Sequence, residues 1–148
     1  MIDLEGVLSQ WDEDSNIPQH QLDEVSRQTP KLHAKYLQYL ALAKLQLKRA
    51  ENNQKTLLKD KWLYYNGKMD EETLREKGWD LDPFGGLRIL KGEMDYYYDS
   101  DPEIQKSEEK VLYHKTMIDI LVQIVDKLKW RHQTIKNMID WRKFEAGG

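Results

Sequence analysis

Lysines alternate with large aromatic rings in one short segment of the chain. Residues 59–68 are Lys-Asp-Lys-Trp-Leu-Tyr-Tyr-Asn-Gly-Lys, and they close a stretch, 31–68, that holds nine Lys and Arg but only two acids. Phosphate groups attract Lys and Arg, and every nucleobase has a flat face that can stack on an aromatic ring. The pattern therefore indicates single-stranded nucleic acid as the first ligand to consider. The ordinary alternative for such a charge run is a solvated helix face.

Motifs of catalysis are missing from the sequence. The four histidines show none of the pairings or the HExxH pattern of a zinc site. The acids between positions 95 and 103 lack the order and the internal glycine of a calcium-binding loop. The segment Phe84-Gly85-Gly86-Leu87 lacks the spacing of a phosphate loop, no serine lies in a nucleophile-elbow motif, and cysteine is absent. We therefore expect no metal site, no cofactor and no enzymatic activity.

The charges fall into four blocks along the chain. The formal charge is −6 for residues 1–30, +7 for 31–68, −7 for 69–110 and +3 for 111–148, within a net charge of −3. With 33% charged residues the composition suits an elongated helical protein better than a compact globule. We expect a mainly α fold in a single domain, 1–148. Its expected parts are an acidic arm or short helix (1–30), a basic helix (31–68), an irregular middle (69–101) and a C-terminal oligomerisation helix (102–148).

The basic segment has the periodicity of a helix. Apolar and small residues recur at alternating spacings of four and three from Tyr36 to Leu57, which is one face of a helix with a coiled-coil-like stripe. Thr29-Pro30 is a helix-start signal, and Asn66-Gly67 is a helix-end signal. The spacing therefore predicts a helix over about 31–65.

Glycine and proline interrupt the middle segment. Between these breaks, 87–90 and 94–98 are short enough for strands or extended segments, and the pattern favours a small hairpin. The sequence Asp99-Ser100-Asp101-Pro102-Glu103 then predicts the start of a helix, with a capping Asp and a proline behind it.

The predicted C-terminal helix, about 102–145, has two adjacent apolar stripes that cover well over half of its circumference between 111 and 128. One antiparallel partner within the chain cannot cover so wide a face, so we infer self-association. The residues expected at the contact between copies are Ile118, Leu121, Val122, Ile124, Val125, Leu128, Ile135 and Met138.

The N-terminus lacks the basic region and apolar run of a signal peptide, and the most apolar stretch, 117–125, is far too short to span a bilayer. We expect a soluble, cytoplasmic protein with no membrane contact.

Two segments together resemble one family. The segment 58–68 resembles the Lys-x-Arg-x-x-Tyr-Tyr-x-Gly-Arg segment of the UvsY recombination mediators of T-even-type bacteriophages. The C-terminal Trp141-Arg142-Lys143-Phe144-Glu145-Ala146-Gly147 resembles the ending of that family, Arg-x-Phe-Glu-Ala-Gly. The resemblance extends over most of 31–148, with a long helix, an acidic middle and an apolar second helix in the same order.

The resemblance implies a protein that binds single-stranded DNA, contacts the phage single-strand-binding protein and loads a RecA-like phage recombinase in the infected bacterial cell. It also implies a closed, ring-like homo-oligomer of about six or seven subunits. By position, the lysines would contact phosphates and the tyrosines would stack on bases or brace the loop. With the preceding lysine, the expected DNA-binding residues are Lys55, Lys59, Lys61, Tyr64, Tyr65 and Lys68.

The sequence also departs from that pattern. Asp60 puts an acid between two lysines, and Lys61 and Lys68 stand where arginines occur, without the bidentate fork of a guanidinium. The alternative function is a helical oligomeric adaptor without nucleic-acid binding. In that case the basic face would pair with acidic segments of neighbouring subunits.

Overall fold

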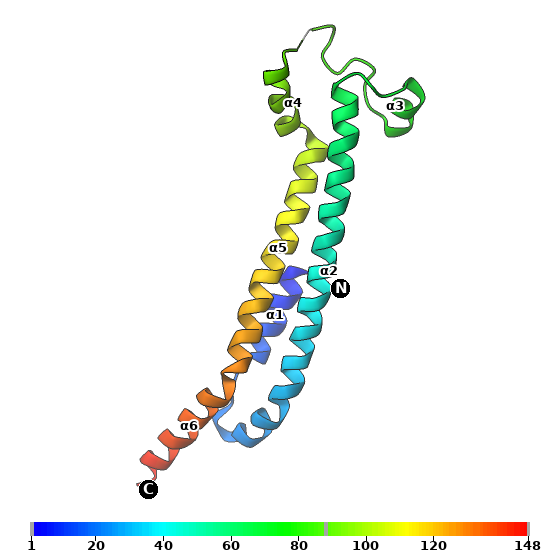
Figure 1. Ribbon diagram of the computed structural model, residues 1–148. Coiled ribbons are helices and arrows are strands. Elements are labelled where there is room, and N and C mark those ends of the chain that lie inside the picture. The colour runs from blue at the N-terminus through cyan, green and yellow to red at the C-terminus, as the bar shows by residue number, and fades with distance from the viewer. Residues whose placement is uncertain (1, 88, 148) are drawn as a thin grey trace. The chain divides into compact units, whose positions relative to one another are not determined.

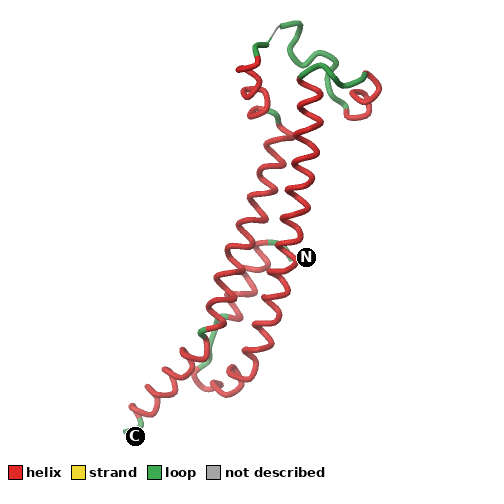
Figure 2. The backbone as a smooth tube through the Cα atoms, viewed as in Figure 1, coloured by secondary structure: helices red, strands yellow, loops and turns green. Residues whose placement is uncertain are grey.

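The computed structural model describes residues 2–87 and 89–147 (Figure 1). Every regular element in these ranges is helical, as the absence of yellow from Figure 2 shows, so the mainly α fold is confirmed. The helices are α1 (Leu4–Asp14), α2 (Leu22–Tyr65), α3 (Glu71–Lys77), α4 (Met94–Ser100), α5 (Pro102–Lys129) and α6 (Arg131–Glu145), with short 3-10 turns at Gln19–Gln21 and Lys91–Glu93.

The chain forms two compact units. The first comprises Met1–Gln46 and His114–Gly148, and the second comprises Leu47–Tyr113. Helix α2 therefore contributes its first half to one unit and its second half to the other.

The core of the first unit is built by three helices. Val7 of α1 and Tyr36 and Ala43 of α2 pack with an aliphatic stripe of α5, which consists of Met117, Leu121, Ile124 and Leu128. Tyr36 is fully buried and meets the ring of Trp11 edge to face at 5.6 Å. The acidic N-terminal segment thus supplies a second helix that covers the apolar face of α5.

Polar contacts hold the end of α1 in place. The Asp14 carboxylate accepts hydrogen bonds from Lys35 Nζ at 2.7 Å and from the Tyr36 hydroxyl at 2.8 Å. The guanidinium of Arg131 donates to the backbone carbonyls of Asp14 and Asn16 at 2.6 and 3.1 Å. Burial, with the hydrogen bond to Asp14, raises the pKa of Tyr36, so the hydroxyl stays neutral and continues to donate.

The predicted boundaries of both long helices are wrong in part. Helix α2 begins at Leu22, so Pro30 lies inside it and cannot donate to the Ser26 carbonyl. Figure 1 shows α2 bent near this end, which is the expected effect of an internal proline. Thr29 is not a cap, because its hydroxyl bonds the Val25 carbonyl within the helix at 2.8 Å.

The C-terminal helix is two helices rather than one. The backbone leaves the helical region at Trp130, with φ −96° and ψ 2°. The break coincides with the anchoring of the next residue, Arg131, to carbonyls near the end of α1. That contact joins positions more than a hundred residues apart, so local periodicity could not reveal it.

The predicted hairpin is also wrong. No strand occurs among the described residues of the middle segment, and Met94–Ser100 is helix α4. Its Tyr97 packs against Phe84 at 4.8 Å, and its Tyr98 packs against Tyr65 at 5.6 Å. Strand propensity of a tyrosine run is weak and depends on context, so these contacts decide the local structure. The predicted helix start is confirmed, because Asp101 Oδ1 accepts from the amides of Glu103 and Ile104 at 2.9 and 3.1 Å.

We expect Leu121→Ala to lower the free energy of unfolding by about 3 kcal/mol, because it removes buried methyl groups from the core of the first unit. The matched control is Val122→Ala on the next position of α5, where the side chain is 47% exposed and the expected change is below about 0.5 kcal/mol. Urea unfolding followed by circular dichroism at fixed protein concentration measures both. Equal destabilisation by the two variants would mean that a partner chain covers Val122.

Candidate nucleic-acid interface

The second half of α2 has one exposed, basic face. Positions spaced by three and four residues lie on the same side of a helix. From 48 to 62 this spacing selects side chains that are all exposed: Lys48, Asn52, Lys55, Lys59 and Trp62. The face extends over about 20 Å of helix, at 1.5 Å per residue.

The opposite face of the same helix is buried in the second unit. It carries Ala50 at 4% exposure, Lys61 at 4% and Tyr64 at 8%. Successive helical residues are rotated by about 100°, so Lys59 and Lys61 point in nearly opposite directions although only one residue separates them. The side chain of Lys59 is 68% exposed, whereas that of Lys61 is 5% exposed.

The ammonium of Lys61 lies in a cage of acids and rings. Its Nζ is 3.0 Å from Asp101 Oδ2 and 3.3 Å from Glu103 Oε1, and 3.8 Å from the centre of the Trp79 ring. The Tyr65 hydroxyl donates to the same Asp101 oxygen at 2.6 Å, and Trp79 Nε1 donates to Glu103 Oε1 at 2.6 Å. The positive charge is therefore matched inside the protein.

Aromatic rings pack around the C-terminal end of α2 in this unit. The Tyr64 ring lies 5.0 Å from the ring of Trp79, and the Tyr65 ring lies 5.8 Å from that of Phe84. These distances fall within the range of favourable ring pairs. These two ring pairs connect the end of α2 to the segment that follows α3.

The electrostatics of Asp101 follow from its partners. Burial by itself raises the pKa of Asp101, but hydrogen bonds from Tyr65, Lys61 and the Ile104 amide outweigh it, so the pKa lies below its usual value. Burial, reinforced by the hydrogen bond to Asp101, raises the pKa of Tyr65. The tyrosine therefore stays protonated and the carboxylate stays ionised at neutral pH.

The structure thus separates the six predicted DNA-binding residues into two groups. Lys55, Lys59 and Lys68 are exposed, and Lys68 Nζ lies 4.6 Å from the centre of the Trp62 ring. Lys61 and Tyr64 are buried, and Tyr65 is half-buried with its hydroxyl engaged. Which of them contact DNA remains a prediction.

Two features of this site are absent from the set predicted from the sequence. Trp62, 46% exposed, belongs to the basic face, and its spacing of three from Lys59 and seven from Lys55 is the signal that could have found it. The partners Asp101 and Glu103 lie 40 and 42 positions beyond Lys61, and no local pattern identifies them.

The residues predicted to join copies of the chain lie mostly inward. Leu121, Ile124 and Leu128 belong to the core of the first unit and Ile135 is 4% exposed. Ile118, Val125 and Met138 are half-buried, and Val122 is exposed. Self-association through this stripe remains a prediction.

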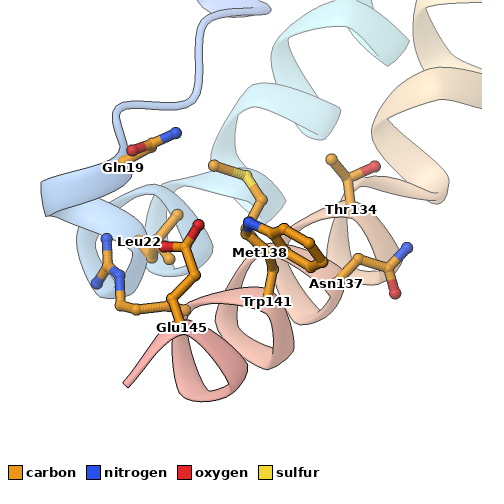
Figure 3. A pocket seen from close by; sticks show the side chains of 8 residues that line it. Gln19, Leu22, Thr134, Asn137, Met138, Trp141 and Glu145 are labelled. Carbon is orange, nitrogen blue, oxygen red and sulfur yellow. The ribbon is translucent and has the colours of Figure 1, made fainter. Parts of the chain in front are cut away.

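Helix α6 also carries exposed apolar side chains. Trp141 and Phe144 are 62% and 70% exposed and stack on each other at 5.5 Å. Trp141 and Met138 also line an open hollow of about 380 Å³ with Leu22 of α2, shown in Figure 3.

Neither a group of metal-ligating side chains nor a membrane-spanning helix occurs in the described part of the chain. Within 2–87 and 89–147, no three His, Asp or Glu side chains are grouped as metal ligands would be. None of the helices in the described ranges has the length and hydropathy needed to cross a bilayer.

Comparison with known proteins places this architecture in the class of phage recombination mediators. The family model described as "Recombination, repair and ssDNA binding protein UvsY" matches residues 10–148. Because the match covers nearly the whole chain, the chain belongs to the UvsY family.

Individual relatives agree with this assignment. The chain is 27% identical over 144 residues to the recombination protein uvsY of Enterobacteria phage T4, covering 97% of this chain and 98% of the relative. A crystal structure of the bacteriophage T4 recombination mediator protein UvsY matches with a TM-score of 0.79 at 26% identity over 99% of both chains. Another crystal form matches with a TM-score of 0.75 at 25% identity, over 93% of this chain and 97% of the other.

We expect Asp101→Asn to lower the free energy of unfolding at pH 7 by about 3 kcal/mol, because it leaves the Lys61 ammonium buried without its closest carboxylate. The folded-state pKa of Asp101 is depressed, so its contribution is complete above the unfolded-state pKa of about 3.9 and is lost as the pH falls through the folded-state value. The stability difference between variant and wild type should therefore shrink at low pH.

The control for this measurement is Asp99→Asn, an exposed carboxylate two residues earlier. Chemical unfolding from pH 7 to pH 3 gives both curves. A difference between Asp101→Asn and wild type that stays constant over this range would contradict the role assigned to the Asp101 carboxylate.

Proposed function

We propose that this protein is a recombination mediator that binds single-stranded DNA through the exposed basic face of α2. In this function it promotes loading of a RecA-like phage recombinase onto strands covered by the phage single-strand-binding protein. The process serves homologous recombination, replication and repair in the cytoplasm of the infected host cell. The observation that carries the proposal is the row of exposed lysines on one helical face, in a chain that belongs to the UvsY family.

In this proposal, contacts between lysines and phosphates supply the affinity of the protein for single-stranded DNA. Lys55 and Lys59 lie on successive turns of α2, and Lys68 follows just beyond its end, so a strand along this face meets several positive charges in series. Each such contact releases counterions, which makes the binding sensitive to salt. The inward-facing side chains fix the position of this surface without contacting the strand. Their contacts hold the end of α2 against the rest of the second unit, and they belong to Lys61, Tyr64 and Tyr65.

Several copies of the chain would bind the same DNA strand. In a ring-like homo-oligomer, the basic faces of different subunits engage one strand together, which raises the effective concentration of each site. A strand wrapped or bent in this way presents a different backbone path to the single-strand-binding protein, which loosens that protein and exposes the strand to the recombinase. The acidic segments 1–30 and 69–110 are the candidates for contacts with these proteins.

We expect replacement of Lys55, Lys59 and Lys68 by Ala to weaken binding to a labelled single-stranded oligonucleotide and to flatten its salt dependence. Each lost phosphate contact reduces the slope of log K against log salt by about 0.7 for a single strand, so the triple variant should lose about 2. Fluorescence anisotropy across a salt series measures both quantities.

The matched control replaces Lys106 and Lys110, two exposed lysines of α5 in the same unit. It removes positive charge without touching the basic face of α2, and its salt slope should equal that of the wild type. An unchanged slope in the triple variant would remove the assignment. Absence of wild-type binding at low salt would favour the adaptor function instead.

Lys59→Ala should act mainly on DNA binding, whereas Lys61→Ala should act mainly on stability. The first removes an exposed charge, so we expect weaker DNA binding and a stability change within about 0.5 kcal/mol. The second leaves Asp101 buried without its cation and should cost about 3 kcal/mol. Urea unfolding and anisotropy on the same samples, with light scattering to follow the mass, distinguish them. Equal stability of the two variants would contradict the burial of Lys61.

A further inference from the structure

One aromatic ring of the second unit faces solvent on the same helix whose other rings are packed. Trp62 is 46% exposed, whereas Tyr64, two residues later, is 8% exposed and lies against Trp79. The difference follows from helix geometry, because positions 62 and 64 point in nearly opposite directions. The exposed indole lies at the C-terminal end of the basic face of α2, one turn beyond Lys59.

Lysines lie on the same helical face as this indole and just beyond the end of the helix. Lys59 precedes it by three residues and Lys55 by seven, so both lie on its face of α2. Lys68 Nζ lies 4.6 Å from the centre of the indole ring, which is within the range of a cation–π contact. The chain therefore places one flat ring beside the Lys68 ammonium and on the same helical face as Lys55 and Lys59.

The nearby acid does not cancel this arrangement. Asp60 follows Lys59 directly, but its Oδ2 accepts from Lys77 Nζ at 3.3 Å, while Lys59 Nζ lies farther away, at 3.8 Å from Oδ1. The Lys59 side chain stays 68% exposed. The face thus keeps its positive charge, which is complementary to a phosphate backbone and unfavourable for a second copy of the same face.

The two tyrosines are poorly placed to receive a base. Tyr65 donates to Asp101 at 2.6 Å and meets the ring of Tyr98 at 5.6 Å. Tyr64 is buried against Trp79, whose indole in turn donates to Glu103. A nucleobase on either tyrosine would have to displace these contacts, whereas at the 46% exposed indole of Trp62 it would displace at most the Lys68 ammonium, 4.6 Å from the ring centre.

From these observations we infer that Trp62 is the base-stacking residue of the surface. A nucleobase of single-stranded DNA stacks on its indole while Lys55, Lys59 and Lys68 hold the neighbouring phosphates. The inference rests on the proposed function and deepens it, since it names the side chain that binds an unpaired base. Bases of a duplex are stacked on one another, so the same ring also favours a single strand over a double strand.

The test separates stacking from phosphate binding by removing the bases from the probe. Binding of labelled oligo(dT) and of an abasic strand of equal length is measured by anisotropy for the wild type, Trp62→Ala and Trp62→Phe. Stacking is worth about 1–3 kcal/mol per base, so Trp62→Ala should weaken oligo(dT) binding about fivefold or more. Its affinity for the abasic strand and its salt slope should match those of the wild type, and Trp62→Phe should retain most of the binding.

Tyr96→Ala is the control, because Tyr96 is a 75% exposed ring on α4 of the same unit, outside the basic face. Equal loss on both probes, or no loss on oligo(dT), would overturn the stacking role while leaving phosphate binding intact. A fall in oligomer mass for Trp62→Ala by light scattering would also overturn it and would identify Trp62 as a contact between copies. A wild type that binds neither probe at low salt would overturn the proposed function itself.

Discussion

The burial of the Lys61 ammonium is the constraint on which the second unit depends. Removing an ion from water costs several kcal/mol unless other charges and hydrogen bonds replace the water. Asp101 and Glu103 supply the charges, and the Trp79 ring covers the ammonium at 3.8 Å. Asp101 also caps α5 through its other oxygen, so a single carboxylate joins the end of α2 to the start of α5.

This constraint also sets the orientation of α2 in the second unit. With Lys61 and Tyr64 turned inward, helix geometry leaves Lys55, Lys59 and Trp62 turned outward. The contact that stabilises the unit and the surface that we propose to bind DNA are therefore opposite sides of the same few turns. The acid at position 60, which interrupts the basic pattern of the family segment, lies between the two sides and is engaged by Lys77.

The two units are stabilised by different means. The first has an aliphatic core to which α1 contributes, and Arg131 fastens the end of that helix through two backbone carbonyls. The second buries fewer large aliphatic side chains, Leu74, Ile104 and Val111, and adds rings packed around a buried ion pair. A core of aliphatic side chains tolerates many substitutions of similar volume, whereas a buried ion pair requires each partner.

The sequence by itself determined the helical class, the existence of a long basic helix, its end at Asn66-Gly67 and the start of α5 at Asp101-Pro102. These features depend on periodicity and capping, which are properties of neighbouring residues. The tertiary structure alone decided that Lys61 is buried, that α1 covers α5, that the tyrosine run of α4 is helical and that the C-terminal helix breaks at Trp130. Each of these depends on partners tens of residues away, and a local pattern cannot show which distant side chain will neutralise a charge or cover a ring.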